Sequence, residues 1–278
     1  MGITAIAPWF GAKRNMARDI VAEFGDHRVY WEPMCGSMAV LLCKAPVAME
    51  TVNDLHGDLI NLARVVQDEV LGPQLYRRLR RTMMSEVFHR EAALRHRTRG
   101  CAGDGPPDLD VAYDYFLRSW LGRNGVAGTA SYNLGFCVRY TANGGHAAKR
   151  WASVVDSIPA WRRRLRNVTI LCRDALTLLE RINDEPGTVI YLDPPYLAKG
   201  AKYVHDFTDA DHKRLADALR RFRSARVIVS YYDDPRLEDL YPSWTQRKIE
   251  VTKSLVNQGM RDKRGPVSAT EVLLINGP

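Results

Sequence analysis

A carboxylate followed by two prolines and a tyrosine is the segment of this sequence with the clearest chemical potential. Asp193, Pro194, Pro195 and Tyr196 directly follow an apolar run at residues 188–192. The run predicts a strand buried on both faces, and the prolines end it because proline cannot donate to a sheet ladder. Asp193 is therefore expected at the carboxyl end of a strand, where open α/β sheets bind ligands.

This segment offers two hydrogen-bond acceptors and an aromatic ring. Each proline holds the residue before it extended, so the Asp193 carboxylate and the Pro194 carbonyl are expected side by side. Two adjacent acceptors suit the two N–H donors of the exocyclic amine of a nucleobase, and Tyr196 could stack on that base. The alternative is an ordinary turn at the end of a strand, since Asp and Pro are common in turns.

Asp193-Pro194-Pro195-Tyr196 resembles the DPPY motif of amino-group DNA methyltransferases. These enzymes use S-adenosylmethionine to methylate N6 of adenine or N4 of cytosine, and Asp in the first place favours adenine. The resemblance implies that all four residues are catalytic, that Asp193 also borders the cofactor, and that the adenine is flipped out of the DNA helix to reach them.

The N-terminal segment 8–13 resembles the Pro-Trp-x-Gly-x-Lys signature of Dam-type adenine methylases. This resemblance implies that Trp9 and Lys13 contact S-adenosylmethionine. From the residues alone, the segment is equally a capped loop before the amphipathic helix expected from Met16 to Phe24.

A second cofactor motif follows a predicted strand that begins at residue 29. Residues 32–38 resemble the family's Glu-Pro-Phe-x-Gly-x-Gly loop, which implies cofactor contacts for Glu32 and Gly36. Met34 stands in place of the phenylalanine and Met38 in place of the second glycine, so the space near the cofactor is expected to be narrower.

Two further carboxylates end predicted strands. Asp54 lies about twenty residues beyond the glycine loop, the spacing at which α/β folds place a ribose ligand; its alternative role is the N-cap of the next helix. Asp174 ends the strand predicted at residues 167–173, and the resemblance places it near the adenine amine of the cofactor. A helix cap is again the alternative.

Residues 71–166 are expected to form a target-recognition insert, with residues 1–70 and 167–278 forming the catalytic domain. Alternating apolar residues before Asn143-Gly144 predict a β-hairpin, from which Arg139 could reach guanine in the major groove. Lys149 and Arg150 are expected at DNA phosphates, although an ordinary surface role explains each as well.

Composition agrees with a nucleic-acid partner. The chain has 278 residues, a formal net charge of +8 and five cysteines without metal-ligand spacing. Neither a signal peptide nor a membrane span is evident, so we expect a cytoplasmic protein without a bound metal that acts on double-stranded DNA. The target sequence, a cognate restriction nuclease and the oligomeric state stay open.

Together these features predict an α/β fold, a class I S-adenosylmethionine-dependent methyltransferase sheet of Rossmann-like type with an inserted helical and hairpin recognition domain. The predicted enzyme is a site-specific adenine-N6 DNA methyltransferase. The alternatives are methylation of RNA adenine or of cytosine N4, and a catalytically inactive DNA-binding module.

Overall fold

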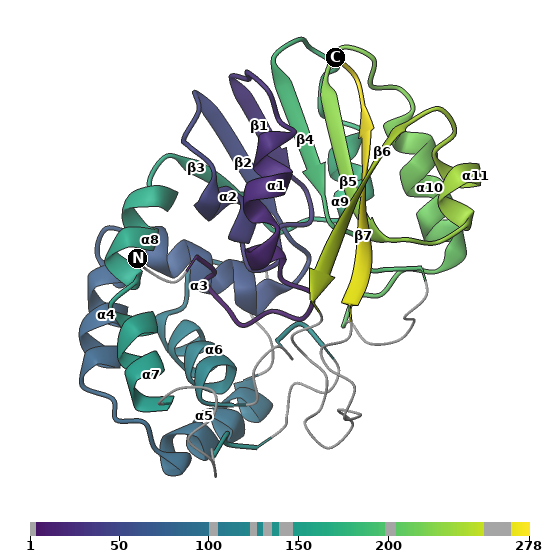
Figure 1. Cartoon of the computed structure of the whole chain (residues 1–278). Coiled ribbons are helices and arrows are strands. Elements are labelled where there is room, and N and C mark those ends of the chain that lie inside the picture. The colour runs from purple at the N-terminus through teal and green to yellow at the C-terminus, as the bar shows by residue number, and fades with distance from the viewer. Residues whose placement is uncertain are drawn as a thin grey trace.

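The computed structural model describes residues 4–99, 105–122, 127–129, 135–138, 147–197, 204–252 and 268–278. In these residues, seven strands form one sheet in the order β3-β2-β1-β4-β5-β7-β6 (Figure 1). The strands are β1 (Val29–Glu32), β2 (Met49–Asn53), β3 (Val168–Leu171), β4 (Thr188–Leu192), β5 (Arg226–Tyr232), β6 (Thr245–Thr252) and β7 (Ser268–Asn276).

The sheet has the predicted Rossmann-like organisation. Strands β1 to β5 pair in parallel, whereas β7 pairs antiparallel with both β5 and β6. The chain runs outward from β1 to β2 and β3, then returns to place β4 on the other side of β1. This reversal between β1 and β4 is the point at which such sheets bind ligands. The predicted α/β fold is confirmed, and β6 and β7 close the sheet as an antiparallel pair.

The central strand β4 is buried on both faces, as its composition predicts. All five of its residues are buried. Val189 and Tyr191 belong to one hydrophobic core, and Ile190 and Leu192 belong to a second core on the opposite face. Alternate side chains therefore anchor β4 in two layers, and Asp193 leaves the strand from a fixed position.

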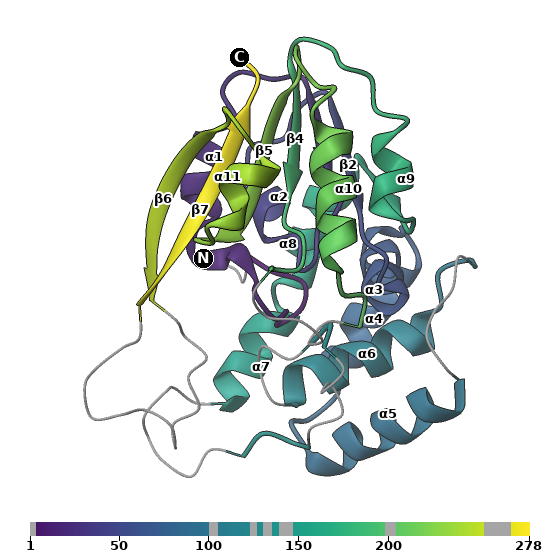
Figure 2. The same cartoon turned by 90° about the vertical axis from the view of Figure 1, so that its right-hand side faces the viewer.

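Helices cover both faces of the sheet (Figure 2). One face carries α1 (Ala17–Ala22), α2 (Ala39–Cys43) and α3 (Gly57–Gln67), and the other carries α9 (Ala175–Leu179), α10 (Asp209–Leu219) and the short α11 (Arg236–Leu240). Helix α10 begins at a reciprocal capping box that Thr208 and Asp211 form.

Between α3 and β3, the described residues form five more helices, which gather at the lower left of Figure 1. They are α4 (Leu71–Arg80), α5 (Glu86–Arg99), α6 (Leu109–Leu121), α7 (Ala147–Val155) and α8 (Ile158–Leu165). Helix α3 packs against α4, α6 and α8, and α5 packs against α6. This helical layer is thus joined to the sheet through α3.

Most of the predicted hairpin, including Arg139, lies outside the described residues. Near the predicted hairpin, Phe136 forms an isolated antiparallel bridge with Gly122. None of the four cysteines that the structure describes takes part in a disulfide. None of the described helices has both the length and the apolar character that crossing a membrane requires.

Candidate active site

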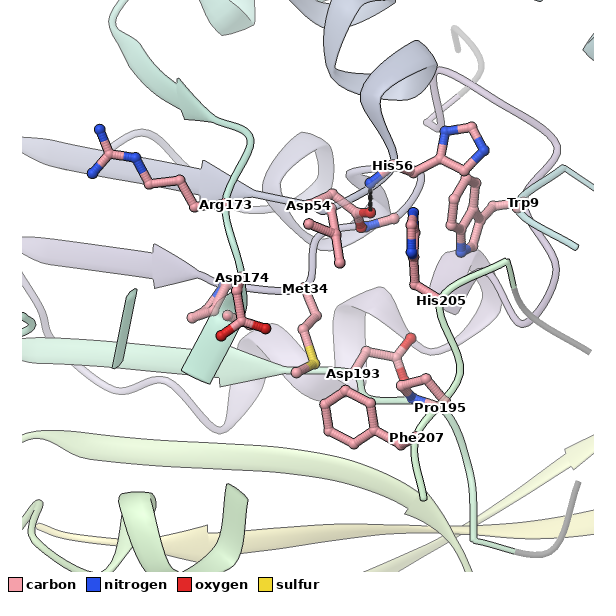
Figure 3. A pocket seen from close by; sticks show the side chains of 15 residues that line it. Trp9, Met34, Asp54, His56, Arg173, Asp174, Asp193, Pro195, His205 and Phe207 are labelled. Atoms are coloured by element: carbon pink, nitrogen blue, oxygen red, sulfur yellow. Dashed lines mark hydrogen bonds between the residues drawn. The ribbon is translucent and has the colours of Figure 1, made fainter. Parts of the chain in front are cut away.

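A cleft opens where β1, β2, β3 and β4 end (Figure 3). The segments that follow these four strands supply most of its wall, and the N-terminal segment and residues 205 and 207 complete it. Six residues predicted from the sequence line it: Trp9, Gly36, Asp54, Asp174, Asp193 and Pro195. Residues far apart in the chain thus meet at the point where the strand order reverses.

The Asp193 carboxylate is held through one of its two oxygens. The ammonium of Lys13 lies 2.8 Å from Oδ1, and the Ser230 hydroxyl donates to the same oxygen at 2.9 Å. The Tyr196 hydroxyl lies 3.4 Å from Oδ1. Among the described residues, these contacts all fall on Oδ1, and the side chain is 22% exposed at the cleft. Oδ2 is therefore the oxygen that these contacts leave for a ligand.

Lys13 is buried among acidic groups. Its Nζ lies 3.5 Å from Glu271 Oε2 on β7, in addition to its contact with Asp193. Burial opposes the ammonium charge, but Asp193 and Glu271 outweigh it and raise the pKa of Lys13. Lys13 therefore carries a positive charge inside the protein and joins the ends of β4 and β7.

Tyr196 lies behind the cleft wall. Its side chain is buried, and its hydroxyl bonds to Lys13 and, at 3.2 Å, to Glu271. Its ring packs edge-on against Tyr232 with centroids 4.4 Å apart. The described walls of the cleft do not include Tyr196. The structure thus fixes the orientation of this ring, while stacking on a base stays a prediction.

Trp9 forms one end of the cleft, where its indole is enclosed by backbone. A Cβ on Gly36 would lie 2.9 Å from the indole nitrogen, and a Cβ on Gly128 would lie 2.5 Å from two ring carbons. His56 packs edge-on against the same ring, with centroids 5.3 Å apart. Glycine is therefore required at both positions for the ring to occupy this place.

The loop after β1 contains an unusual backbone conformation. Met38 has φ 58° and ψ 28°, the left-handed region that favours glycine, and its side chain is fully buried in the core. This is the residue that stands in place of the second glycine of the motif. The chain therefore keeps a glycine-like backbone here and uses the methionine side chain for packing.

Asp54 and Asp174 both border the cleft, but they differ in their local roles. Asp54 accepts the amides of Gly36 at 2.8 Å and His56 at 2.9 Å, one on each oxygen. The proposal that Asp54 caps α3 is wrong, because His56 is the N-cap and its ring accepts from Leu59. Asp174 does cap its helix: its Oδ1 accepts the Thr177 amide at 2.8 Å.

Glu32 lies in a smaller adjoining pocket that also includes Lys13, Gly36 and Asp193. Its carboxylate is buried and accepts the Tyr30 hydroxyl at 2.9 Å. Burial raises the pKa of Glu32 to about 8. A buried acid of this kind is poised to receive a cationic group, because such a partner compensates the cost of its ionisation.

The predicted phosphate contacts lie on α7. Lys149 is exposed, whereas Arg150 is half-buried with its guanidinium 5.4 Å from the Trp120 ring centre. Their proposed contacts with DNA stay predictions.

Sequence reasoning missed several residues of the site. Ser230 reaches the Asp193 cluster from β5, Glu271 contacts the same cluster from β7, a role that its sequence position does not indicate, and His56 lines the cleft. His205 and Phe207 also line the cleft; they lie in the aromatic segment 202–207, which the sequence places near the flipped base. A serine or a glutamate within an otherwise apolar strand is the one local signal that marks the first two. A polar group in such a strand needs a buried partner.

The cleft has the features that S-adenosylmethionine requires. Gly36 and the indole of Trp9 allow close approach of a flat ligand, and Met34 and Phe207 face each other across the space (Figure 3). The carboxylates of Asp54 and Asp174 lie at the ends of β2 and β3, where they can accept from hydroxyl and amine groups. The residues present therefore fit the cofactor.

Among solved structures, precorrin 8w decarboxylase from Methanobacterium thermoautotrophicum is 13% identical to this chain, with a TM-score of 0.36 over 95% of this chain and 89% of that chain. SMU.472, a proposed methyltransferase solved in complex with SAH, is 12% identical to this chain. Its TM-score is 0.26, over 73% of this chain and 55% of that chain. These TM-scores carry no functional argument. A search of curated proteins gives no match.

A family model gives the decisive comparison. The model described as D12 class N6 adenine-specific DNA methyltransferase matches residues 9–257. The matched range includes the cleft and the segment from Asp193 to Tyr196. Because the match covers most of the sequence, the chain belongs to the D12 class N6 adenine-specific DNA methyltransferase family, whose methyl donor is S-adenosylmethionine.

Proposed function

We propose that this enzyme methylates N6 of an adenine that is flipped out of double-stranded DNA at a specific site. The observation that carries the proposal is the position of Asp193. Its carboxylate follows β4 directly, is held through Oδ1 by Lys13 and Ser230, and borders the cleft that fits the cofactor. An adenine must leave the base stack to reach such a group.

Asp193 acts on the target amine through its position and charge. Oδ2 and the Pro194 carbonyl accept the two amine hydrogens, which directs the nitrogen lone pair out of the plane of the base. The carboxylate also stabilises the positive charge that grows on this nitrogen during transfer. Stacking of Tyr196 on the base requires its ring to become accessible from the cleft; in the structure the ring is buried, and its hydroxyl contacts Glu271 and Lys13.

The cofactor is held by residues from the ends of three strands and from the N-terminal segment. Trp9 and Gly36 enclose it, Asp54 and Asp174 accept from its ribose and adenine, and Glu32 with Lys13 receives its charged amino acid end. When bound, S-adenosylmethionine supplies an electrophilic methyl group. Fixed placement of both reactants accounts for much of the rate enhancement in this arrangement.

The helical layer from α4 to α8, within residues 71–166, serves target recognition in this proposal. Lys149 and Arg150 on α7 contact phosphates, and Arg139 reads the major groove. The net charge of +8 supports a polyanionic partner. Five cysteines without metal-ligand spacing agree with the reducing cytoplasm as the location of the enzyme.

Nucleoside analysis tests this proposal. The protein is incubated with labelled S-adenosylmethionine and, in parallel, with double-stranded DNA, single-stranded DNA and RNA. Label in N6-methyladenine from the double-stranded sample supports the proposal. Label in N4-methylcytosine, or label confined to RNA, would replace it with the corresponding alternative. Sequencing of the methylated DNA then gives the target site.

A further inference from the structure

Glu271 is a buried acid of the active-site cluster that lies beyond the range matched by the family model. It projects from β7, a strand whose following residues Val272, Leu273 and Leu274 are fully buried and apolar. Its Oε2 lies 3.5 Å from Lys13 Nζ and 3.2 Å from the Tyr196 hydroxyl. Burial of a charged group is costly unless partners compensate it, so the position needs an explanation.

The charges of the cluster supply that explanation. Lys13 lies 2.8 Å from Asp193, so the two groups form a nearly neutral pair. A neutral pair attracts a positive centre far less than a lone carboxylate does. The target nitrogen becomes positive as the methyl group arrives. With Asp193 and Lys13 alone, the ammonium of Lys13 would cancel much of the attraction between Asp193 and the positive charge on the target nitrogen.

Glu271 contributes the missing negative charge. It contacts the same ammonium from the side of β7, so Lys13 is shared between two carboxylates and the three groups together carry a charge of −1. Burial raises the pKa of Glu271, and Asp193 raises it further, while Lys13 acts in the opposite direction. These opposing effects are those expected of an acid held in a shared ion pair.

We propose that Glu271 is a positioning residue for methyl transfer, which acts through Lys13: it offsets the ammonium charge and holds Lys13 where it orients Asp193 toward the target amine. This inference rests on the proposed role of Asp193. It assigns a function to β7 beyond closing the sheet. It also explains why a strand of the core retains an acid beside a lysine from the N-terminal segment.

Replacement of Glu271 by glutamine and by aspartate separates charge from shape. Glu271→Gln keeps the size and the oxygen that faces Lys13 but removes the charge, whereas Glu271→Asp keeps the charge and shortens the side chain. We expect the single-turnover rate of Glu271→Gln to fall roughly tenfold or more, with Glu271→Asp between it and the wild type. Calorimetric affinity for S-adenosylmethionine and the KM for DNA should change less than the rate.

Glu250→Gln is the matched control. Glu250 lies on the neighbouring strand β6, is exposed, and undergoes the same chemical change without contact with the cluster. Its rate should equal that of the wild type.

The proposal is overturned if Glu271→Gln keeps the wild-type rate, or if Glu271→Asp is slower than Glu271→Gln, because shape would then matter more than charge. A Glu271→Gln variant that does not fold would also overturn it, since Glu271 would then serve stability. Failure of the proposed function is distinct, because the wild type itself would give no N6-methyladenine.

Discussion

The indole of Trp9 occupies the space in which a side chain on Gly128 would begin. A Cβ at Gly128 would lie 2.5 Å from the ring, and the Phe10 amide donates to the Ala127 carbonyl at 3.1 Å. Val204, beyond the Asp193 segment, donates its amide to Gly128 at 3.0 Å. The N-terminal cofactor segment is therefore tied by backbone contacts to the loop after α6 and to the segment that follows Tyr196.

Gly128→Ala should weaken binding of S-adenosylmethionine by about tenfold or more, because the added methyl group displaces the Trp9 ring from the cleft. Gly187→Ala is the control: Gly187 has a similar positive φ of 74°, against 82° for Gly128, but a Cβ there meets no atom within 4 Å. Both changes carry backbone strain of about 1–2 kcal/mol. Calorimetric titration should therefore show reduced affinity only for Gly128→Ala. Equal affinities for the two variants would show that Trp9 does not contribute to cofactor binding.

The conformation of Met38 predicts an unusual order of stability among the wild type and two Met38 variants. Its left-handed backbone favours glycine, but its side chain is fully buried. Met38→Gly relieves strain of about 1 kcal/mol and loses burial worth about 2–5 kcal/mol, so it should be less stable than the wild type. Met38→Ala keeps the buried Cβ, worth about 0.8 kcal/mol, but it also keeps backbone strain of about 1–2 kcal/mol. Urea unfolding should give the order wild type, Met38→Gly, Met38→Ala. A Met38→Ala variant more stable than Met38→Gly would show that the turn is not strained.

The elements nearest the chemistry could be predicted from sequence because their signals are local. The strand β4 and the end that delivers Asp193 follow from five consecutive apolar or β-branched residues and two prolines. The antiparallel pair of β6 and β7 follows from the same kind of pattern. The capping box at Thr208 needs only four residues to be recognised.

The contacts that complete the site depend on long-range packing, which no local pattern encodes. Lys13 and Glu271 meet only because β7, which follows β6 in the chain, lies between β5 and β6 in the sheet. Asp54 looks like a helix cap in the sequence, yet His56 takes that role and Asp54 turns to the amide of Gly36. Propensity describes each residue alone, whereas tertiary contacts decide between its competing partners.

The raised pKa of Glu32 predicts how the stability of the protein changes with pH. Burial raises its pKa to about 8 in the folded protein, above the ordinary value of 4.5. Between these values the folded state holds a proton that the unfolded chain has lost, so stability falls as the pH rises through this window. Glu32→Gln removes this cost and keeps an acceptor for Tyr30. At pH 8 its melting temperature should exceed that of the wild type, and its free energy of unfolding should be higher by a few kcal/mol at most. Both gains should shrink toward pH 5.

Glu238→Gln, on the exposed surface of α11, is the control for this experiment. A Glu32→Gln gain that is the same at pH 5 and pH 8, or a loss of stability at pH 8, would contradict the assignment of a buried, protonated Glu32.

The role of Asp193 is tested most directly by transfer of labelled methyl groups to DNA by the wild type and by Asp193→Ala. The change removes the carboxylate and leaves the Pro194 carbonyl and the helical layer from α4 to α8 in place. The account predicts N6-methyladenine with the wild type, none above background with Asp193→Ala, and DNA binding that both proteins retain. Methylation by Asp193→Ala at the wild-type rate would contradict it.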